Sequence, residues 1–99
     1  MPRSVSRSSR DRMPLLMTKD EAVPLKRAAE FAGVPVSRVR RWNGLHGIAR
    51  QAAACGPLEV SLVGLSMVLH GDLEALELLR SGSRSDPRVR RHLDHLGLP

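Results

Sequence analysis

The chain has few aromatic residues, one cysteine and no long apolar run. Its 99 residues include one Phe, one Trp and no Tyr, so any core must be aliphatic. The single cysteine, Cys55, cannot form an intramolecular disulfide, which favours a reducing compartment. The longest apolar stretch, residues 60–69, is interrupted by serine and glycine and is about half a membrane span in length. These absences predict a cytoplasmic protein without a disulfide framework or a transmembrane helix.

Residues with catalytic or metal-binding chemistry are also scarce. His92 and His95 lie three residues apart on an expected helix, but nothing nearby in the sequence supplies a third and fourth metal ligand. Cys55 has no general base at a suggestive spacing, and no glycine-rich phosphate loop is present. We therefore expect no catalytic residues, no metal and no cofactor, and we do not expect an enzyme.

Positive charge, by contrast, is abundant. Sixteen Lys and Arg residues stand against ten Asp and Glu residues, a formal net charge of +6, and fourteen of the cations are Arg. The planar guanidinium group matches the geometry of phosphate and binds it in a bidentate manner. Nucleic acid is therefore the first partner to consider, and an anionic membrane surface is the second.

The composition divides the chain into a short arm and one domain. Residues 1–12 contain four Arg and four Ser and almost no apolar side chains, which predicts a disordered basic arm. This arm either touches DNA phosphates or is a solvated tail without fixed contacts. Residues 13–99 are expected to form a single domain. A short helical turn is expected before Pro24, where Thr18 and Glu21 have the spacing of a capping box.

Residues 25–45 have the pattern of two short helices joined by a tight turn. Apolar residues recur at helical spacing over residues 25–32, and Gly33 is suited to end that helix. After Pro35, a second helix would bury Val36, Val39 and Trp42, with Leu45 following on the same side, and Asn43-Gly44 would stop it. The second helix is rich in arginine on its exposed side. This pattern predicts a helix-turn-helix, the core of a mainly helical fold.

In this interpretation the second helix enters the major groove of double-stranded DNA. Ser37, Arg38 and Arg41 would reach base edges or flanking phosphates. Phosphate contacts that position the protein are expected from other exposed cations. Arg50 would contact phosphate or remain a solvated surface residue. The full set of expected DNA contacts is Lys26, Arg27, Ser37, Arg38, Arg40, Arg41 and Arg50.

The segment from Leu25 to Ile48 resembles the winged helix-turn-helix of the MerR superfamily, including its excisionase-like and antitoxin-linked members. The matching positions are Ala28-Ala29, Gly33-Val34, Val39-Arg40 and Trp42, whereas Arg41 stands where many members have Tyr. The resemblance implies a wing after the second helix, with strands at residues 45–48 and 58–62, although the alanine-rich segment between them favours helix. It also implies a helical pair after the wing.

The C-terminal part of the chain predicts two or three further helices. Ser61 is a candidate N-cap for one helix and Asp72 for the next, and a last helix would open at Ser85 and end before Gly97. The leucine stripe at residues 73, 76 and 79 is expected to face the core. The arginines at 88, 90 and 91 are either a solvated face with intrahelical ion pairs or a second phosphate clamp.

Together these features predict a sequence-specific DNA-binding protein, a small transcriptional regulator. An autoregulating antitoxin or an excisionase-like factor fits nearly as well and would add a toxin or recombinase as protein partner. A homodimer or a head-to-tail assembly is expected, because a small DNA-binding domain gains contacts by presenting more than one copy. The alternative is an interaction module whose leucine-rich C-terminal helices bind a protein without DNA contact. RNA binding is disfavoured by the lack of aromatic residues that stack on bases.

Overall fold

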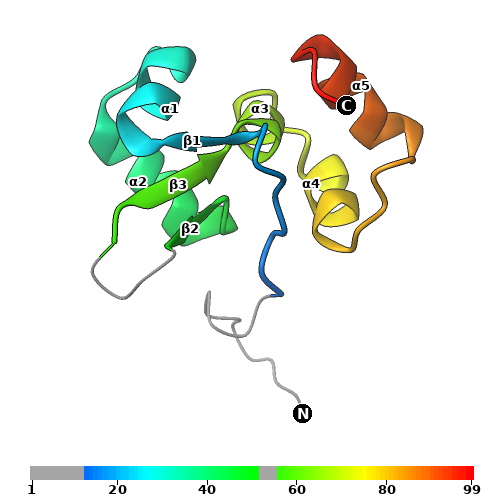
Figure 1. Ribbon diagram of the computed structural model, residues 1–99, viewed down its shortest axis with the longest axis horizontal. Helices are drawn as coiled ribbons and strands as arrows, with labels where there is room; N and C mark the ends of the chain where they lie inside the picture. The colour runs from blue at the N-terminus through cyan, green and yellow to red at the C-terminus, as the bar shows by residue number, and fades with distance from the viewer. Residues whose placement is uncertain (1–12, 52–55) are drawn as a thin grey trace.

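The computed structural model of the chain describes residues 13–51 and 56–99, and it is mainly helical, as the sequence predicts. Five helices accompany a small three-stranded antiparallel sheet (Figure 1). The predicted N-terminal arm and Cys55 lie outside the described residues. Along the chain the elements are β1 (Ala22–Pro24), α1 (Leu25–Ala32), α2 (Val36–His46), β2 (Ala49–Gln51), β3 (Leu58–Ser61), α3 (Leu62–Leu69), α4 (Leu73–Arg80) and α5 (Pro87–His95).

The first two helices are joined by a tight turn at Gly33. This residue has a φ of 70°, a left-handed conformation that favours glycine, and its N–H donates to the Glu30 carbonyl. Ala28 and Ala29 are 0% and 5% exposed, so small side chains occupy the buried face of α1. On α2, Val39 is fully buried and Trp42 packs partly buried against the core. Two helices with a glycine turn are therefore confirmed.

The predicted end of α2 is wrong. The helix does not stop at Asn43-Gly44 but continues through His46, and Gly47 ends it with a φ of 66°. Asn43 is a residue of this helix, and its side-chain Oδ1 accepts a hydrogen bond from the Ala49 N–H at 2.8 Å. The first strand predicted at residues 45–48 is consequently displaced: residues 45–46 form the last helical turn, and β2 begins at Ala49.

The sheet has β3 in its centre, with β1 and β2 pairing on either side in antiparallel register. The second predicted strand, residues 58–62, is confirmed to within one residue. The helical turn expected before Pro24 is instead a turn followed by β1. The Thr18 hydroxyl does contact Glu21 at 3.0 Å, but the chain then extends and pairs with β3. Pro24 is tolerated there because β1 is an edge strand.

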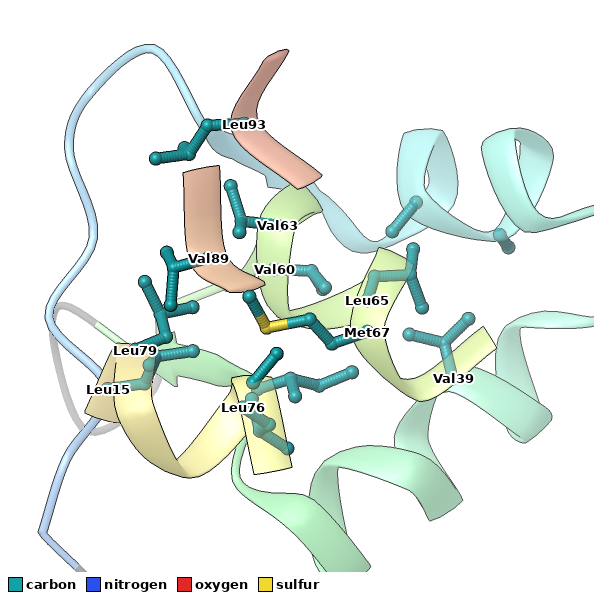
Figure 2. Close-up of a cluster of buried hydrophobic side chains, with 14 residues drawn as sticks. Leu15, Val39, Val60, Val63, Leu65, Met67, Leu76, Leu79, Val89 and Leu93 are labelled. Carbon is teal, nitrogen blue, oxygen red and sulfur yellow. The ribbon is translucent and has the colours of Figure 1, made fainter. Parts of the chain in front are cut away.

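The core is aliphatic, as expected, and α3 passes through its middle (Figure 2). Five of the eight α3 residues are buried, which fits a helix that is apolar on almost every side. Leu15, from the segment before β1, is only 6% exposed and joins this core. Figure 1 shows α1 and α2 on one side of α3, and α4 and α5 on the other. The core members are Leu15, Ala28, Ala29, Val39, Ile48, Val60, Val63, Leu65, Met67, Ala75, Leu76, Leu79, Val89 and Leu93.

The three C-terminal helices are confirmed, together with two of their predicted caps. Ser61 accepts a hydrogen bond from the Gly64 N–H, and Asp72 accepts one from the Ala75 N–H. The last helix begins one or two residues later than predicted, because Asp86 rather than Ser85 caps it. In the leucine stripe, residues 76 and 79 are buried, whereas Leu73 is 46% exposed. Among the described residues, no helix is long and apolar enough to cross a membrane.

Two arginines of the C-terminal half fasten the segment before β1 to the domain. Arg84 donates to both carboxylate oxygens of Glu21, at 3.0 and 3.1 Å, and Glu21 is 1% exposed. The Ser61 hydroxyl donates to the same carboxylate at 3.2 Å. Arg80 donates to the Met13 carbonyl at 3.1 Å and also to the His46 carbonyl at the end of α2. These polar contacts link segments that are distant in the sequence.

Candidate nucleic-acid interface

All seven residues predicted to contact DNA are exposed in the structure. Lys26 and Arg27 lie in the first turn of α1, and Arg50 lies on β2. The remaining four lie in the first half of α2, on either side of the buried Val39 in the sequence: Ser37, Arg38, Arg40 and Arg41. The structure therefore places six of the seven on the α1–α2 pair, and the seventh on the hairpin formed by β2 and β3.

The cations on α1 and α2 differ from most others in having no acidic partner. Within the described chain, no hydrogen bond or ion pair engages the side chain of Lys26, Arg27, Arg38, Arg40 or Arg41. The arginines that do contact a carboxylate are Arg50, Arg80, Arg84, Arg88 and Arg90. Five positive charges on one helix pair are thus left for solvent or for an external anion.

The basic side chains of α2 are directed to two different places. Arg38 and Arg41 are three residues apart, so they lie on one exposed face of the helix, away from Val39. Arg40 instead lines a hollow of about 350 Å³ together with Lys26 and residues of β1 and β3. Cations that converge on one hollow from two helices are suited to hold a single phosphate group.

The N-termini of α1 and α2 add to the positive potential of this surface. Pro24 and Pro35 precede the two helices, and neither helix has a capping side chain or an acidic residue in its first turn. The first N–H groups of each helix therefore have no side-chain acceptor, and the helix dipole places partial positive charge there. Ser37, in the first turn of α2, is exposed beside these groups.

Arg50 is the exception among the predicted contacts. Its Nε donates to Glu59 Oε1 at 2.9 Å across the β2–β3 pair, and Nη1 donates to the Met17 carbonyl at 3.4 Å. Its charge is already compensated, so an external phosphate would have to compete with Glu59. The sequence did not reveal this pairing, because the two residues meet only through the strand register.

The structure adds one exposed apolar residue, Leu45, to this surface. Leu45 is 54% exposed and lies four residues after Arg41, on the same face of α2. The sequence predicted Leu45 either on the buried side of the second helix or in the first strand of the wing, and therefore not at the interface. Had α2 been extended past Gly44, the helical spacing from Arg41 would have identified it.

The second arginine cluster, on α5, is largely neutralised. Arg90 pairs with Asp94 at 2.6 Å within the helix, and Arg88 pairs with Glu74 of α4 at 2.7 Å. Of the two predicted alternatives, the geometry favours the solvated face with ion pairs over the second phosphate clamp. Arg91 has no such partner among the described residues.

Three polar side chains behind α5 form a hydrogen-bonded chain that was not anticipated. His92 Nε2 lies 2.9 Å from Asp72 Oδ2, and His92 Nδ1 lies 3.1 Å from Ser66 Oγ. An ionised carboxylate only accepts hydrogen bonds, so Nε2 carries the proton and donates. Although serine, histidine and aspartate also form hydrolytic triads, Ser66 is 1% exposed and out of reach of a substrate. These two hydrogen bonds therefore connect α3, α5 and the N-cap of α4.

Metal-ligating groups do not assemble in the part of the chain that the structure describes: it contains no group of three or more His, Cys, Asp or Glu placed to hold a metal ion.

Comparisons of the chain with models of known protein families, with curated proteins and with solved structures found no match. The function is therefore inferred from the geometry and charge of the α1–α2 surface.

Proposed function

We propose that this chain is a double-stranded DNA-binding protein in which α1 and α2 act as a helix-turn-helix. The observation that carries the proposal is the group of five unpaired cations on these two helices. Leaving like charges uncompensated on one helix pair is unfavourable for an isolated domain and favourable for one that meets a polyanion. A MerR-like winged module, working as a small transcriptional regulator, is the form that this proposal takes.

The dimensions of α2 suit the major groove. Its 11 residues give a length of about 16 Å at 1.5 Å per residue, and a groove about 12 Å wide admits an α-helix. With Val39 facing the core, the opposite face presents Arg38 and Arg41 to base edges. Leu45, on that same face, would contact a thymine methyl group.

The remaining cations are assigned to the phosphate backbone. Lys26 and Arg40 meet at the hollow beside the start of α1, where a phosphate would also face the free N–H groups of that helix. The β2–β3 hairpin follows α2 directly and would serve as the wing, with Arg50 shared between Glu59 and the DNA. A homodimer would present two such surfaces to a two-fold site.

Protein binding through the C-terminal helices is the second candidate function. Leu73, 46% exposed, lines a shallow apolar hollow on α4 with Leu78, Glu74, Glu77 and Arg88. A toxin or a recombinase docking there is the form implied by the antitoxin and excisionase versions of the proposal. Without DNA contact, the same hollow would make the chain an interaction module.

A paired-variant experiment tests the DNA-binding proposal. Arg38→Ala/Arg41→Ala removes two unpaired charges from α2, and Arg88→Ala/Arg90→Ala removes two ion-paired charges from α5 as the matched control. We expect the α2 variant to remain folded and to lose affinity for its selected DNA site by about 1–3 kcal/mol for each base-reading arginine. The control should bind nearly as the unaltered chain does.

Fluorescence anisotropy over a salt series provides the measurement. The logarithm of the association constant should fall linearly with the logarithm of the salt concentration, with a slope of about −0.9 for each phosphate contact. An α2 variant that stays folded and binds DNA at full affinity would overturn the proposal. Binding of a protein partner with little salt dependence, and no binding of DNA, would favour the interaction module.

A further inference from the structure

Three of the four histidines of the chain meet at one hollow between the α3–α4 connection and α5. The hollow has a volume of about 680 Å³, within the range of small-molecule sites. In Figure 1, α5 lies on the other side of α3 from α1 and α2, so this hollow is separate from the proposed DNA surface. Its lining residues are His70, Gly71, Asp72, Arg91, His92 and His95.

The three imidazole rings differ in the hydrogen bonds that they have free. His92, 7% exposed, uses both nitrogens on Asp72 and Ser66. His70 donates from Nδ1 to the Ser66 carbonyl at 2.8 Å, which leaves its Nε2 available. His95 contacts the His70 ring edge-on, with centroids 6.4 Å apart, and has no hydrogen bond within the described chain. His70 and His95 therefore have polar atoms to offer to a ligand.

The hollow is lined by one arginine and one carboxylate, and only the carboxylate is engaged by other groups of the described chain. Arg91 is the one arginine of the described C-terminal half that contacts no carboxylate. The only carboxylate in the lining, Asp72, is already engaged by His92 and by the Ala75 N–H. The nearby acids Glu74 and Asp94 are paired with Arg88 and Arg90. No unpaired carboxylate of the lining opposes an anion there.

We propose that this hollow binds a small phosphate-bearing molecule. Arg91 would bind two phosphate oxygens through its guanidinium group, and the ring of His95 would donate to a third. His70, whose Nδ1 proton is donated to the Ser66 carbonyl, would donate from Nε2 in its imidazolium form. The hollow is larger than inorganic phosphate alone, so the natural ligand would carry an organic part as well. The inference does not rest on DNA binding, because none of its residues belongs to α1 or α2.

The groups that face His70 and His95 across the hollow are Arg91, His92 and Asp72. The neighbouring arginines, Arg88 and Arg90, are held by Glu74 and Asp94. Arg91 is therefore the arginine of this region that is available to an anionic ligand.

Titration of the full chain with inorganic phosphate, followed by NMR of the histidine ring protons, tests the proposal. His46 lies at the end of α2 and serves as an internal reference. At pH 6.5 and constant ionic strength, we expect saturable shifts of the His70 and His95 signals and no saturable shift of the His46 signal. Arg91→Ala should weaken phosphate binding by about tenfold or more, because it removes a charge-assisted contact. Arg88→Ala, the neighbouring paired arginine, should change it little.

The outcomes separate this site from the DNA surface. Arg38→Ala/Arg41→Ala should leave the phosphate response of His70 and His95 unchanged, whatever that variant does to DNA binding. The proposal is overturned if phosphate shifts all four histidines alike, if the shifts do not saturate, or if Arg91→Ala binds phosphate as tightly as the unaltered chain. Because Arg91 is exposed, this substitution is expected to leave the fold intact, which the unchanged His46 signal would report.

Discussion

Asp72 combines a helix cap with a partner for a buried histidine. Its carboxylate accepts from the Ala75 N–H at 3.3 Å and from His92 Nε2 at 2.9 Å. The hydrogen bond from His92 is the largest cause that lowers the pKa of Asp72 below its usual 3.8, and burial opposes it. The ionised form of Asp72 is therefore more stable, relative to the protonated form, in the folded chain than in the unfolded one.

This difference in pKa predicts an acid-sensitive contribution to stability. The unfolded chain binds the proton more readily, so the contribution is complete above about pH 4 and is lost as the pH falls through the lower, folded-state pKa. We expect Asp72→Asn to be less stable than the unaltered chain at pH 7 and to show a shallower loss of stability below about pH 4. Urea unfolding at a series of pH values measures both effects.

Asp86→Asn is the control for this prediction, because Asp86 caps α5 through the Arg88 N–H and has no histidine partner among the described residues. Its stability should decline on acidification with nearly the same profile as the unaltered chain. Identical pH profiles for Asp72→Asn and the unaltered chain would contradict the assigned role of the His92 contact.

At the scale of single residues, the sequence predicted exposure better than pairing. Helical spacing alone placed Arg38 and Arg41 opposite the buried Val39, because a period of 3.6 residues fixes which side chains share a face. It did not predict that Arg50 pairs with Glu59, since this contact depends on strand register. The histidine hollow was missed for a related reason: His70 approaches His92 and His95 only when α5 packs against α3.

Among the helices, local signals were sufficient where a cap or a glycine marked the boundary. Asp72 and Ser61 start α4 and α3 as predicted, and Gly33 ends α1. The boundary at Asn43-Gly44 was wrong because Gly44 has a helical backbone, and Gly47 takes the left-handed conformation instead. Strand β1 was not predicted, since three residues carry little periodicity and the pairing partner is distant in the chain.

Gly64 in α3 allows another part of the chain to approach closely. A Cβ atom there would lie 3.0 Å from Leu15 Cδ2 and 3.2 Å from Ile48 Cγ2. Ile48 is fully buried and β-branched, so it cannot move aside easily. We expect Gly64→Ala to destabilise the domain by about 1–2 kcal/mol, with the cost of overpacking exceeding the gain in helix propensity.

A glycine in α2 offers the matched control. A Cβ atom at Gly44 meets nothing within 4 Å, and its φ is not positive, so Gly44→Ala should stabilise the domain by as much as about 1 kcal/mol. Chemical denaturation of the two variants measures the difference. Equal effects of the two substitutions on the free energy of unfolding would show that the contact with Leu15 and Ile48 is unimportant.

Across the whole molecule, Arg80 connects the proposed DNA-reading helix to the C-terminal helices. Its side chain is 6% exposed, and it donates to the carbonyls of Met13 and His46. Arg80→Met keeps an unbranched, apolar stem but leaves both carbonyls without this donor. A hydrogen bond from a charged donor contributes about 1.5–3 kcal/mol, and water can replace the donor at Met13, which is 66% exposed. We therefore expect a loss of about 2–3 kcal/mol in the free energy of unfolding.

Two measurements check this expectation. Arg88→Ala, which removes an exposed ion pair, should cost no more than about 1 kcal/mol by the same denaturation assay. Hydrogen exchange should show faster opening at the end of α2 in Arg80→Met, since the His46 carbonyl has lost its contact. Unchanged exchange at that end of the helix would mean that α4 does not hold α2 in place.

The burial of α3 has a further consequence for how this protein can be divided or recombined. Because α3 is apolar on almost every side, the segment before it and the segment after it both pack their core side chains against this helix. Neither half has a second apolar surface that could replace α3. A fragment ending at Leu69 would expose Met67 to water, and a fragment beginning at Leu73 would leave Leu76 uncovered. The α1–α2 surface and the hollow lined by His70, His92 and His95 therefore both depend on α3, and we expect that neither can be transferred to another protein without this helix.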